Sequence, residues 1–226
     1  MIGARVIRLD TVASTNDAAA HLAADGEPEG TAIVAAVQFA GRGRHGRSWH
    51  APAGQNICCS VILRPARPVR EWPELSWALA AGVACFAREA GAPGAVVKHP
   101  NDVLVAGRKL AGLLLESRTG GGGQAALVAG IGINVNPGAE DFPPDLRDSA
   151  TSLRMLSGRR QDCDGLLARL FPWLELWYAL WTREGSEGAL GRVEAQALAA
   201  PGGLGSCAAP PVAAGCDAGK ERRPCC

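Results

Sequence analysis

The sequence predicts an α/β (α+β) fold in which a mixed β-sheet carries helices packed mainly on one face. Its 226 residues suffice for one main domain. Segments with strand and helix patterns alternate in the first part of the chain, and hairpin-type turns join the apolar segments that follow. Strands followed by helices and then by hairpins are typical of a sheet that packs against helices.

The first elements are a strand, a helix and a second strand. Segment 4–12, ARVIRLDTV, predicts a short strand. The polar residues 14–16 come next and precede an alanine-rich run with Asp17 in its first turn, a pattern typical of a helix N-terminus. Segment 31–38, TAIVAAVQ, then predicts the second strand.

Segment 41–49, GRGRHGRSW, has the G-x-G-x-x-G spacing of a dinucleotide-binding turn. Such a turn needs a preceding strand, a helix that opens on the last glycine, and an acidic residue about 20 positions later. Only the strand is present, because Pro52 and Gly54 exclude a helix and no acid occurs between Glu29 and Glu71. The segment is a flexible backbone that carries three arginines, and it requires another explanation.

A second group of elements follows this loop. Segment 56–65 predicts a strand, and residues 74–90 have apolar side chains at helical spacing. Segment 95–117 predicts a strand, a turn, a short strand, a tight turn and a further strand, with the strongest hairpin signal at Gly107. Segment 125–136 is almost wholly apolar and predicts the last strand.

The C-terminal part of the chain divides in two. Residues 166–181 predict a helix with several tryptophans, which Pro172 must start or kink. We therefore expect a main domain over 1–185. Residues 186–226 are rich in Ala, Gly, Pro and Cys without periodicity, so we expect a low-complexity, disordered tail. This tail has no C-x-x-C pair and no nearby histidine, which argues against a zinc site.

Composition excludes several classes of function. The net charge of +1 gives no long-range attraction to nucleic acid or to an anionic membrane, so anion binding must come from a local cluster. The longest apolar run is half of the roughly 20 residues that a membrane span requires, and the N-terminus lacks a signal-peptide core. We expect a soluble, cytoplasmic protein in which Cys58, Cys59 and Cys85 belong to the core.

Four polar clusters lie at the ends of predicted strands, where α/β sheets bind ligands. They cover 14–16, 38–49, 98–112 and 130–134. Each cluster alone also has an ordinary structural explanation. In order, these are a helix cap, a solvated basic loop, a turn, and a strand in which glycines relieve crowding. Together they supply arginines for phosphate, a lysine for a carboxylate or phosphate, an aspartate for a metal, and glycines for close backbone approach. This set suits the activation of a carboxylate by a nucleotide.

In these clusters the chain resembles the biotin protein ligases. The family's GRGRxGRxW loop is present at 41–49 and its STN segment at 14–16. Its K-W-P-N-D motif corresponds to KHPND at 98–102, and its K-x-x-G-x-L-x-E motif to 109–116. GIGIN at 130–134 and SATSL at 149–153 also resemble the family. The resemblance covers roughly 7–183 and implies a catalytic domain like those of biotin ligases and class II aminoacyl-tRNA synthetases, whose loop folds over the adenylate.

The resemblance implies a monofunctional biotin–carboxyl-carrier-protein ligase that uses ATP, biotin and Mg²⁺. Biotin is activated as biotinyl-5'-AMP and then transferred to a lysine of a biotin carboxyl carrier domain of a carboxylase, by a monomer or a homodimer. Two alternatives remain: a lipoate or octanoate ligase of the same fold, and a protein that binds biotin or biotinyl-AMP without transferring it. We expect no DNA-binding segment ahead of residue 1, and we expect no counterpart of the family's C-terminal β-barrel after Arg192.

The resemblance also implies roles for individual residues. Cations must offset the repulsion between biotin's carboxylate and ATP. The loop has three glycines and three arginines between 41 and 47 and nothing apolar there before Trp49 to anchor it, so we expect it to be mobile until a ligand orders it. The departure at His99, where tryptophan is usual, leaves the flanking Lys98, Asn101 and Asp102 in place. The expected catalytic residues are Lys109, Arg44 and Asp102, with Asp102 also the metal ligand. The expected biotin-binding residues are Ser14, Thr15, Asn16, Gln38, Gly41, Arg42, Arg44 and Gly112. The expected ATP- and adenylate-binding residues are Arg42, Arg44, Arg47, Trp49, Asn101, Lys109, Gly130, Gly132 and Asn134, the last at an adenine or ribose edge.

Overall fold

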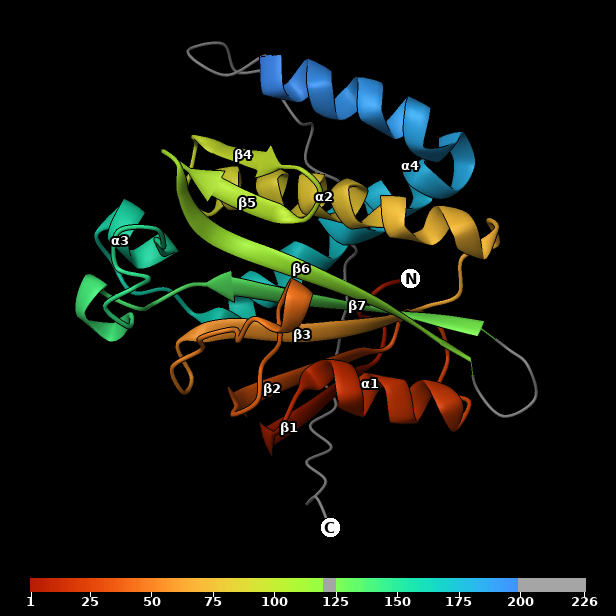
Figure 1. The fold of residues 1–226 in the computed structure, drawn as a ribbon, viewed down its shortest axis with the longest axis horizontal. Coiled ribbons are helices and arrows are strands. Elements are labelled where there is room, and N and C mark those ends of the chain that lie inside the picture. Colours follow the sequence, from red (N-terminus) through yellow and green to blue (C-terminus); the bar gives the residue numbers. More distant parts are fainter. Residues whose placement is uncertain (120–124, 199–226) are drawn as a thin grey trace.

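The computed structural model describes residues 1–119 and 125–198. Seven strands form one sheet in the order β1-β2-β3-β7-β6-β5-β4 (Figure 1). The first two strands pair in parallel and all other neighbours are antiparallel, which confirms the predicted mixed sheet. The strands are β1 Val6–Val12, β2 Ala32–Gln38, β3 Asn56–Leu63, β4 Ala95–Lys98, β5 Asp102–Val105, β6 Arg108–Thr119 and β7 Ala125–Asn134.

The helices lie unequally on the two faces of the sheet. In Figure 1, α2 and α4 lie above the sheet and α1 lies below it, so the helices are mainly on one face, as predicted. None of the described helices combines the length and apolarity needed to cross a membrane. The α-helices are α1 Thr15–Ala24, α2 Leu75–Glu89, α3 Leu153–Ser157 and α4 Cys163–Leu198, and the 3-10 turns are η1 Arg44–Gly46, η2 Val69–Glu74 and η3 Ala139–Asp141.

Strand β3 shows how one sequence serves both faces. Its odd-numbered residues, such as Ile57 and Val61, join the main core beneath α2 and α4. Its Ile62 instead joins a small cluster with Ala19 and Ala23 of α1. Side chains along a strand alternate between the two faces of a sheet. The odd positions of β3 therefore build the core, and the even positions face α1.

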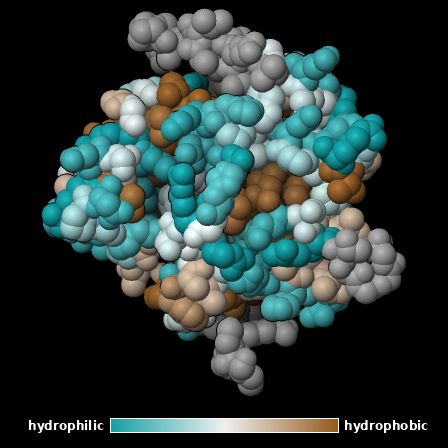
Figure 2. All heavy atoms as spheres, viewed as in Figure 1, coloured by the Kyte–Doolittle hydropathy of each residue, from teal (hydrophilic) through white to brown (hydrophobic). Residues whose placement is uncertain are grey.

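Helix α2 is the centre of the main core. Every residue from 75 to 87 is buried, because the helix lies between the sheet and α4. Its alanines and Gly82 let α4 come close: a Cβ added at Gly82 would lie 3.0 Å from the carbonyl oxygen of Trp173. The tryptophans predicted for the helix at 166–181, which is part of α4, are Trp173, Trp177 and Trp181, and all three are buried. Figure 2 shows a largely hydrophilic surface with an apolar patch near the middle of this view, between α2 and β6.

Helix α4 differs from its prediction at both ends. It begins at Cys163, well before Pro172, and its dihedrals leave the helical region at Gly185 (φ 70°) instead of at the proline. Helical structure then resumes to Leu198, and Ala189 is fully buried. The prediction of an irregular tail is therefore wrong for 186–198, and its remainder, 199–226, lies outside the described residues.

The cysteines predicted for the core are buried. Cys58 and Cys59 lie on β3 and Cys85 lies on α2, all within the core, which confirms the prediction. Burial raises the pKa of Cys58 and of Cys59 to about 12, because a thiolate in apolar surroundings loses its hydration. These thiols are core side chains and not nucleophiles at neutral pH. The cysteines after residue 198 lie outside the described part of the chain.

Candidate functional site

The site begins with the register of three central strands. Cys58, Gly132 and Gly112 lie directly opposite one another on β3, β7 and β6, and the next row joins Ser60 to Gly130 and to β6. Directly paired residues of neighbouring strands point to the same face. Both rows are even positions of β3, so they lie on the face that α1 covers only in part. The glycines carry no side chains, so other groups can come close to the backbone of this stretch of sheet.

In this structure Trp49 and Asn16 occupy the room that the glycines leave. A Cβ added at Gly132 would lie 2.5 Å from Cε2 of Trp49, and one added at Gly112 would lie 3.4 Å from the same indole. A Cβ at Gly130 would overlap the side-chain amide of Asn16. The indole nitrogen of Trp49 is buried without a hydrogen-bond partner among the described residues. The prediction that these three glycines permit close approach therefore has a geometric basis.

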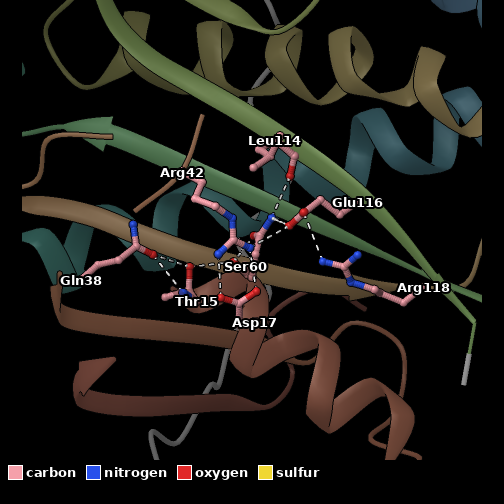
Figure 3. Close-up of polar contacts among 9 residues, drawn as sticks. Thr15, Asp17, Gln38, Arg42, Ser60, Leu114, Glu116 and Arg118 are labelled. Atoms are coloured by element: carbon pink, nitrogen blue, oxygen red, sulfur yellow. Dashed lines mark hydrogen bonds and ion pairs between the residues drawn. The ribbon is translucent and has the colours of Figure 1, made fainter. Parts of the chain in front are cut away.

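Thr15, Gln38 and Ser60 form a hydrogen-bonded cluster at one end of this surface (Figure 3). The backbone N–H and the hydroxyl of Thr15 both donate to Oε1 of Gln38, at 2.9 and 3.1 Å. The hydroxyl of Ser60 lies 2.7 Å from that of Thr15. Because a backbone N–H can only donate, Gln38 must present its oxygen to Thr15 and its amino group elsewhere.

Asn16 extends the cluster toward β6. Its amide nitrogen donates to Oε2 of Glu116 at 2.8 Å and to the Leu114 carbonyl at 3.3 Å. Its amide oxygen accepts from the Ser60 hydroxyl at 2.6 Å. A carboxylate only accepts hydrogen bonds, so Glu116 fixes the orientation of the Asn16 amide. Ser14 is buried at the N-cap of α1, but its hydroxyl makes no capping hydrogen bond.

Arg42 ties the arginine loop to this cluster. Its guanidinium donates two hydrogen bonds to Asp17, at 2.7 and 2.6 Å, and lies 3.5 Å from Glu116, which Arg118 also contacts at 3.2 Å (Figure 3). The two hydrogen bonds that Arg42 donates to Asp17 lower the pKa of Asp17 and raise the pKa of Arg42. Arg42 is thus already neutralised, which does not favour the phosphate contact expected for it.

The rest of the loop is held by polar contacts. The loop is a small hairpin closed by a bridge between Arg42 and Ser48, and the Trp49 N–H donates to the Gly41 carbonyl at 2.8 Å. Arg44 donates to the side-chain oxygen of Asn101 at 3.1 Å. The expectation of a mobile loop rested on the lack of an apolar anchor before Trp49, whereas the loop has polar anchors in the ion pair of Arg42 and the hydrogen bond of Arg44. Whether the loop is mobile without ligand stays a prediction.

Lys109 and Asp102 form the other end of the surface. Nζ of Lys109 lies 2.7 Å from Oδ1 of Asp102 and 5.6 Å from the centre of the Trp49 ring. The Lys109 backbone donates to the carbonyl of Ser149 and accepts from the N–H of Thr151. The motif at 149–153 thus holds the strand that carries the lysine. Among the described residues, no group of three or more His, Cys, Asp or Glu side chains is placed to hold a metal ion.

Two residues that were expected to contact the ligand, Asn134 and Asn101, form hydrogen bonds within the protein. The amide nitrogen of Asn134 is buried and donates to the carbonyl oxygens of Thr151 at 3.0 Å and of Lys109 at 3.4 Å. Asn134 therefore supports the strand that carries Lys109, and its expected contact with an adenine or ribose edge stays a prediction. Asn101 pairs with Leu113 through its backbone and its side chain, although its amide oxygen also reaches Arg44. Arg47 is exposed and makes no ion pair within the described part of the chain.

Three residues of the site were given no role from the sequence, although one of them, Glu116, ends the motif at 109–116. Asp17 and Glu116 hold Arg42, and Ser60 connects Thr15 to Asn16. Ser60 did carry a signal, since it is the polar residue in the middle of the otherwise apolar run 57–63, and it is fully buried. A buried hydroxyl requires a partner, so it marks a polar cluster on one face of the strand.

The chain matches known proteins across this site. Residues 9–136 match the biotin/lipoate A/B protein ligase family. The bifunctional ligase/repressor BirA of Bacillus spizizenii is 38% identical over 178 residues, which are 79% of this chain and 55% of the relative. A biotin--acetyl-CoA-carboxylase ligase of Mycobacterium tuberculosis is 39% identical over 186 residues, covering 77% of this chain and 65% of the relative. The chain thus spans about half to two thirds of the length of these relatives.

Solved structures of biotin protein ligases have a fold similar to that of this chain. A biotin protein ligase from Aquifex aeolicus in complex with biotin and ATP superposes with a TM-score of 0.73 at 28% identity, over 84% of this chain and 76% of the other. A biotin protein ligase from Leishmania major in complex with biotinyl-5-AMP superposes with a TM-score of 0.65 at 27% identity, over 84% and 81% of the two chains.

Proposed function

Because the chain belongs to the biotin/lipoate A/B protein ligase family, we propose that it activates biotin with ATP and transfers it to a lysine of a biotin carboxyl carrier domain. The observation that carries the proposal is the polar cluster of Thr15, Gln38 and Ser60, which a row of glycines joins to Lys109. Relatives of similar sequence are named biotin ligases, and similar structures are described as complexes with biotin, ATP or biotinyl-5-AMP.

The cluster complements the ureido ring of biotin. Gln38 directs its oxygen to Thr15, so its amino group remains to donate to a carbonyl. Thr15 directs its proton to Gln38, and Ser60 directs its own to Thr15 or Asn16, so both hydroxyl oxygens retain lone pairs that accept from N–H groups. A cyclic urea has one carbonyl and two N–H groups. The cluster supplies both kinds of partner.

The other end of the surface is suited to the chemistry. In the first step a carboxylate oxygen of biotin attacks the α-phosphorus of ATP, and pyrophosphate leaves. Lys109, Arg44 and Arg47 supply the positive charge that this meeting of two anions requires. In the second step the neutral amine of the carrier lysine attacks the acyl carbon, loses a proton, and AMP leaves with the electron pair. Trp49 lies over the glycines between the two ends, where it limits access of water to the mixed anhydride.

A magnesium ion fits this site only together with nucleotide. Asp102 is the carboxylate at the reacting end, and it is shared with Lys109. Mg²⁺ commonly binds through one or two carboxylates and the phosphates of a substrate, so one shared carboxylate fits a magnesium–ATP complex and not a metal ion alone. When bound, the ion would neutralise phosphate charge. Calorimetric titration of Asp102→Asn with ATP, with and without Mg²⁺, tests this: the magnesium-dependent gain in affinity should be lost.

The family also includes lipoate ligases, which makes substrate identity the point to test. A lipoyl or octanoyl tail has no N–H groups for Ser60 and Thr15, which favours biotin. Pyrophosphate exchange should therefore depend on biotin, and not on lipoate or octanoate. Mass spectrometry should show a carrier domain gaining one biotin in the presence of ATP. Exchange without carrier labelling would identify an adenylate-forming protein that does not transfer, and exchange with lipoate alone would refute the proposal.

A further inference from the structure

Arg42 stands at the point where the loop meets the body of the protein. Gly41 is buried, and a Cβ added there would overlap the Gln38 amide and lie 3.0 Å from the Trp49 carbonyl oxygen. The base of the loop is thus tightly packed. Arg42 follows immediately, and its backbone bridges Ser48 on the returning side of the loop. Any contact that fixes Arg42 therefore fixes both sides of the hairpin.

The contacts of Arg42 lead to the predicted biotin site. Asp17 follows Asn16 in α1 and accepts two parallel hydrogen bonds from the guanidinium (Figure 3). Glu116, the second carboxylate near Arg42, is the residue that orients the Asn16 amide. Arg42 thus connects the loop to α1, which carries Asn16, and to β6, whose Glu116 orients the Asn16 amide. A fork of two charge-assisted hydrogen bonds also fixes direction, which a single contact does not.

The charges of this group are balanced. Asp17 and Glu116 contribute two negative charges, and Arg42 and Arg118 contribute two positive ones. Arg42 would have to leave Asp17 to serve as a counter-ion for phosphate. Arg44 has the neutral Asn101 as its partner and remains available for an anion. The loop arginines therefore divide their tasks: Arg42 holds the loop, and Arg44 remains available for an anion.

We propose that Asp17 is a positioning residue that, through Arg42, keeps the 41–49 loop closed over the biotin site and slows dissociation of the ligand beneath it. The ligand part of this inference rests on the proposed function. The side chains of Arg42 and Asp17 are 37% and 40% exposed, so water weakens their pairing. The two parallel hydrogen bonds nevertheless make this pair stronger than a single exposed contact. We therefore expect loss of the carboxylate to raise the dissociation rate of biotin about five- to tenfold.

Trypsin tests the closed loop without any ligand, because it cleaves after arginine. Asp17→Asn should increase the rate of cleavage after Arg44 and Arg47. Asp164→Asn is the matched control, since it removes an exposed ion pair of similar length, with Arg8 at 2.6 Å, on α4. Equal cleavage rates in the two variants would overturn the proposal.

Ligand dissociation gives the second readout. The dissociation rate of biotin, measured by stopped flow, should rise in Asp17→Asn and not in Asp164→Asn. Arg42→Lys keeps the charge but cannot form the fork, so it should resemble Asp17→Asn, and the double variant should be no worse than either. Additive effects in the double variant would overturn the coupling. A wild-type protein that does not bind biotin would refute the proposed function, while the trypsin result would still decide the role of Asp17.

Discussion

Replacing Gly132 with alanine should separate the effect of crowding the site from the effect of weakening the fold. The new Cβ would lie 2.5 Å from Cε2 and 2.7 Å from Cζ2 of Trp49. Carbon atoms in favourable contact are about 3.5–4.0 Å apart, so the indole must move by roughly 1 Å. Extra methyl groups in a packed site typically cost about 1–3 kcal/mol.

The cost should fall on the loop, because Trp49 is half-buried and belongs to the loop, whereas Gly132 is held by strands on both sides. The loop should therefore open, and the free energy of unfolding should fall by no more than about 1 kcal/mol. Ligand affinity depends on the closed loop and should fall about 5- to 100-fold, since about 1.4 kcal/mol corresponds to a factor of ten. Calorimetric titration with biotin and urea denaturation measure the two quantities.

Removing the indole provides the control. In a Trp49→Ala background the clash is absent, so Gly132→Ala should cost little further affinity. If Gly132→Ala reduced biotin affinity equally with and without the indole, the alanine would be acting on the sheet and the reasoning would be refuted. A variant that loses several kcal/mol of folding stability would contradict it as well.

Four further predictions concern chemistry and stability. Lys109→Ala should lower pyrophosphate exchange by about 10²-fold, the effect of losing one positioned donor, with an unchanged circular dichroism spectrum. Gly185→Ala should lower the unfolding free energy by about 1–3 kcal/mol in urea denaturation, because the residue has φ 70° and packs against a guanidinium. Peptide mapping after iodoacetamide treatment at neutral pH should find Cys58 and Cys59 unlabelled in the folded protein, since burial raises the pKa of both. The stability difference between wild type and Asp17→Asn should be constant near neutral pH. In thermal unfolding it should begin to shrink as the pH falls below 3.8, the ordinary pKa of an aspartate, and should be lost below the lowered pKa of Asp17, where the folded wild-type carboxylate also loses its charge.

The strands and the main helices were predictable because local patterns determine them. Apolar runs bounded by Gly107 and by the loop gave the strands, and the buried α2 followed from its apolar spacing. The register was not predictable, because the pairing of Ser60 with Gly130 joins segments far apart in the chain. Without that register, the connection from Ser60 to the STN segment could not be inferred.

The end of α4 escaped prediction for a related reason. Glycine and low periodicity favour irregular structure after residue 184, but Arg67 donates to the Thr182 carbonyl and packs on Trp181 from a distant part of the sequence. Ser186 then contacts the indole nitrogen of Trp181. Distant contacts thus stabilise a helix that local sequence alone does not favour. The pairing of Asp17 with Arg42 was not predictable either. From the sequence alone, Asp17 could pair with any of the three arginines of the loop.

The unequal covering of the two sheet faces has a consequence for motion. The face beneath α2 and α4 is sealed by a large core, so exposing it requires unfolding the domain. On the face beside α1, one part of the sheet is covered by the 41–49 loop alone. When this loop lifts, water reaches the Trp49 indole and the backbone of Gly112 and Gly132. The amides of β7 remain paired to β3 and β6 throughout. Hydrogen exchange should therefore find these amides protected even while ligand enters and leaves, which allows rapid gating without loss of the folded state.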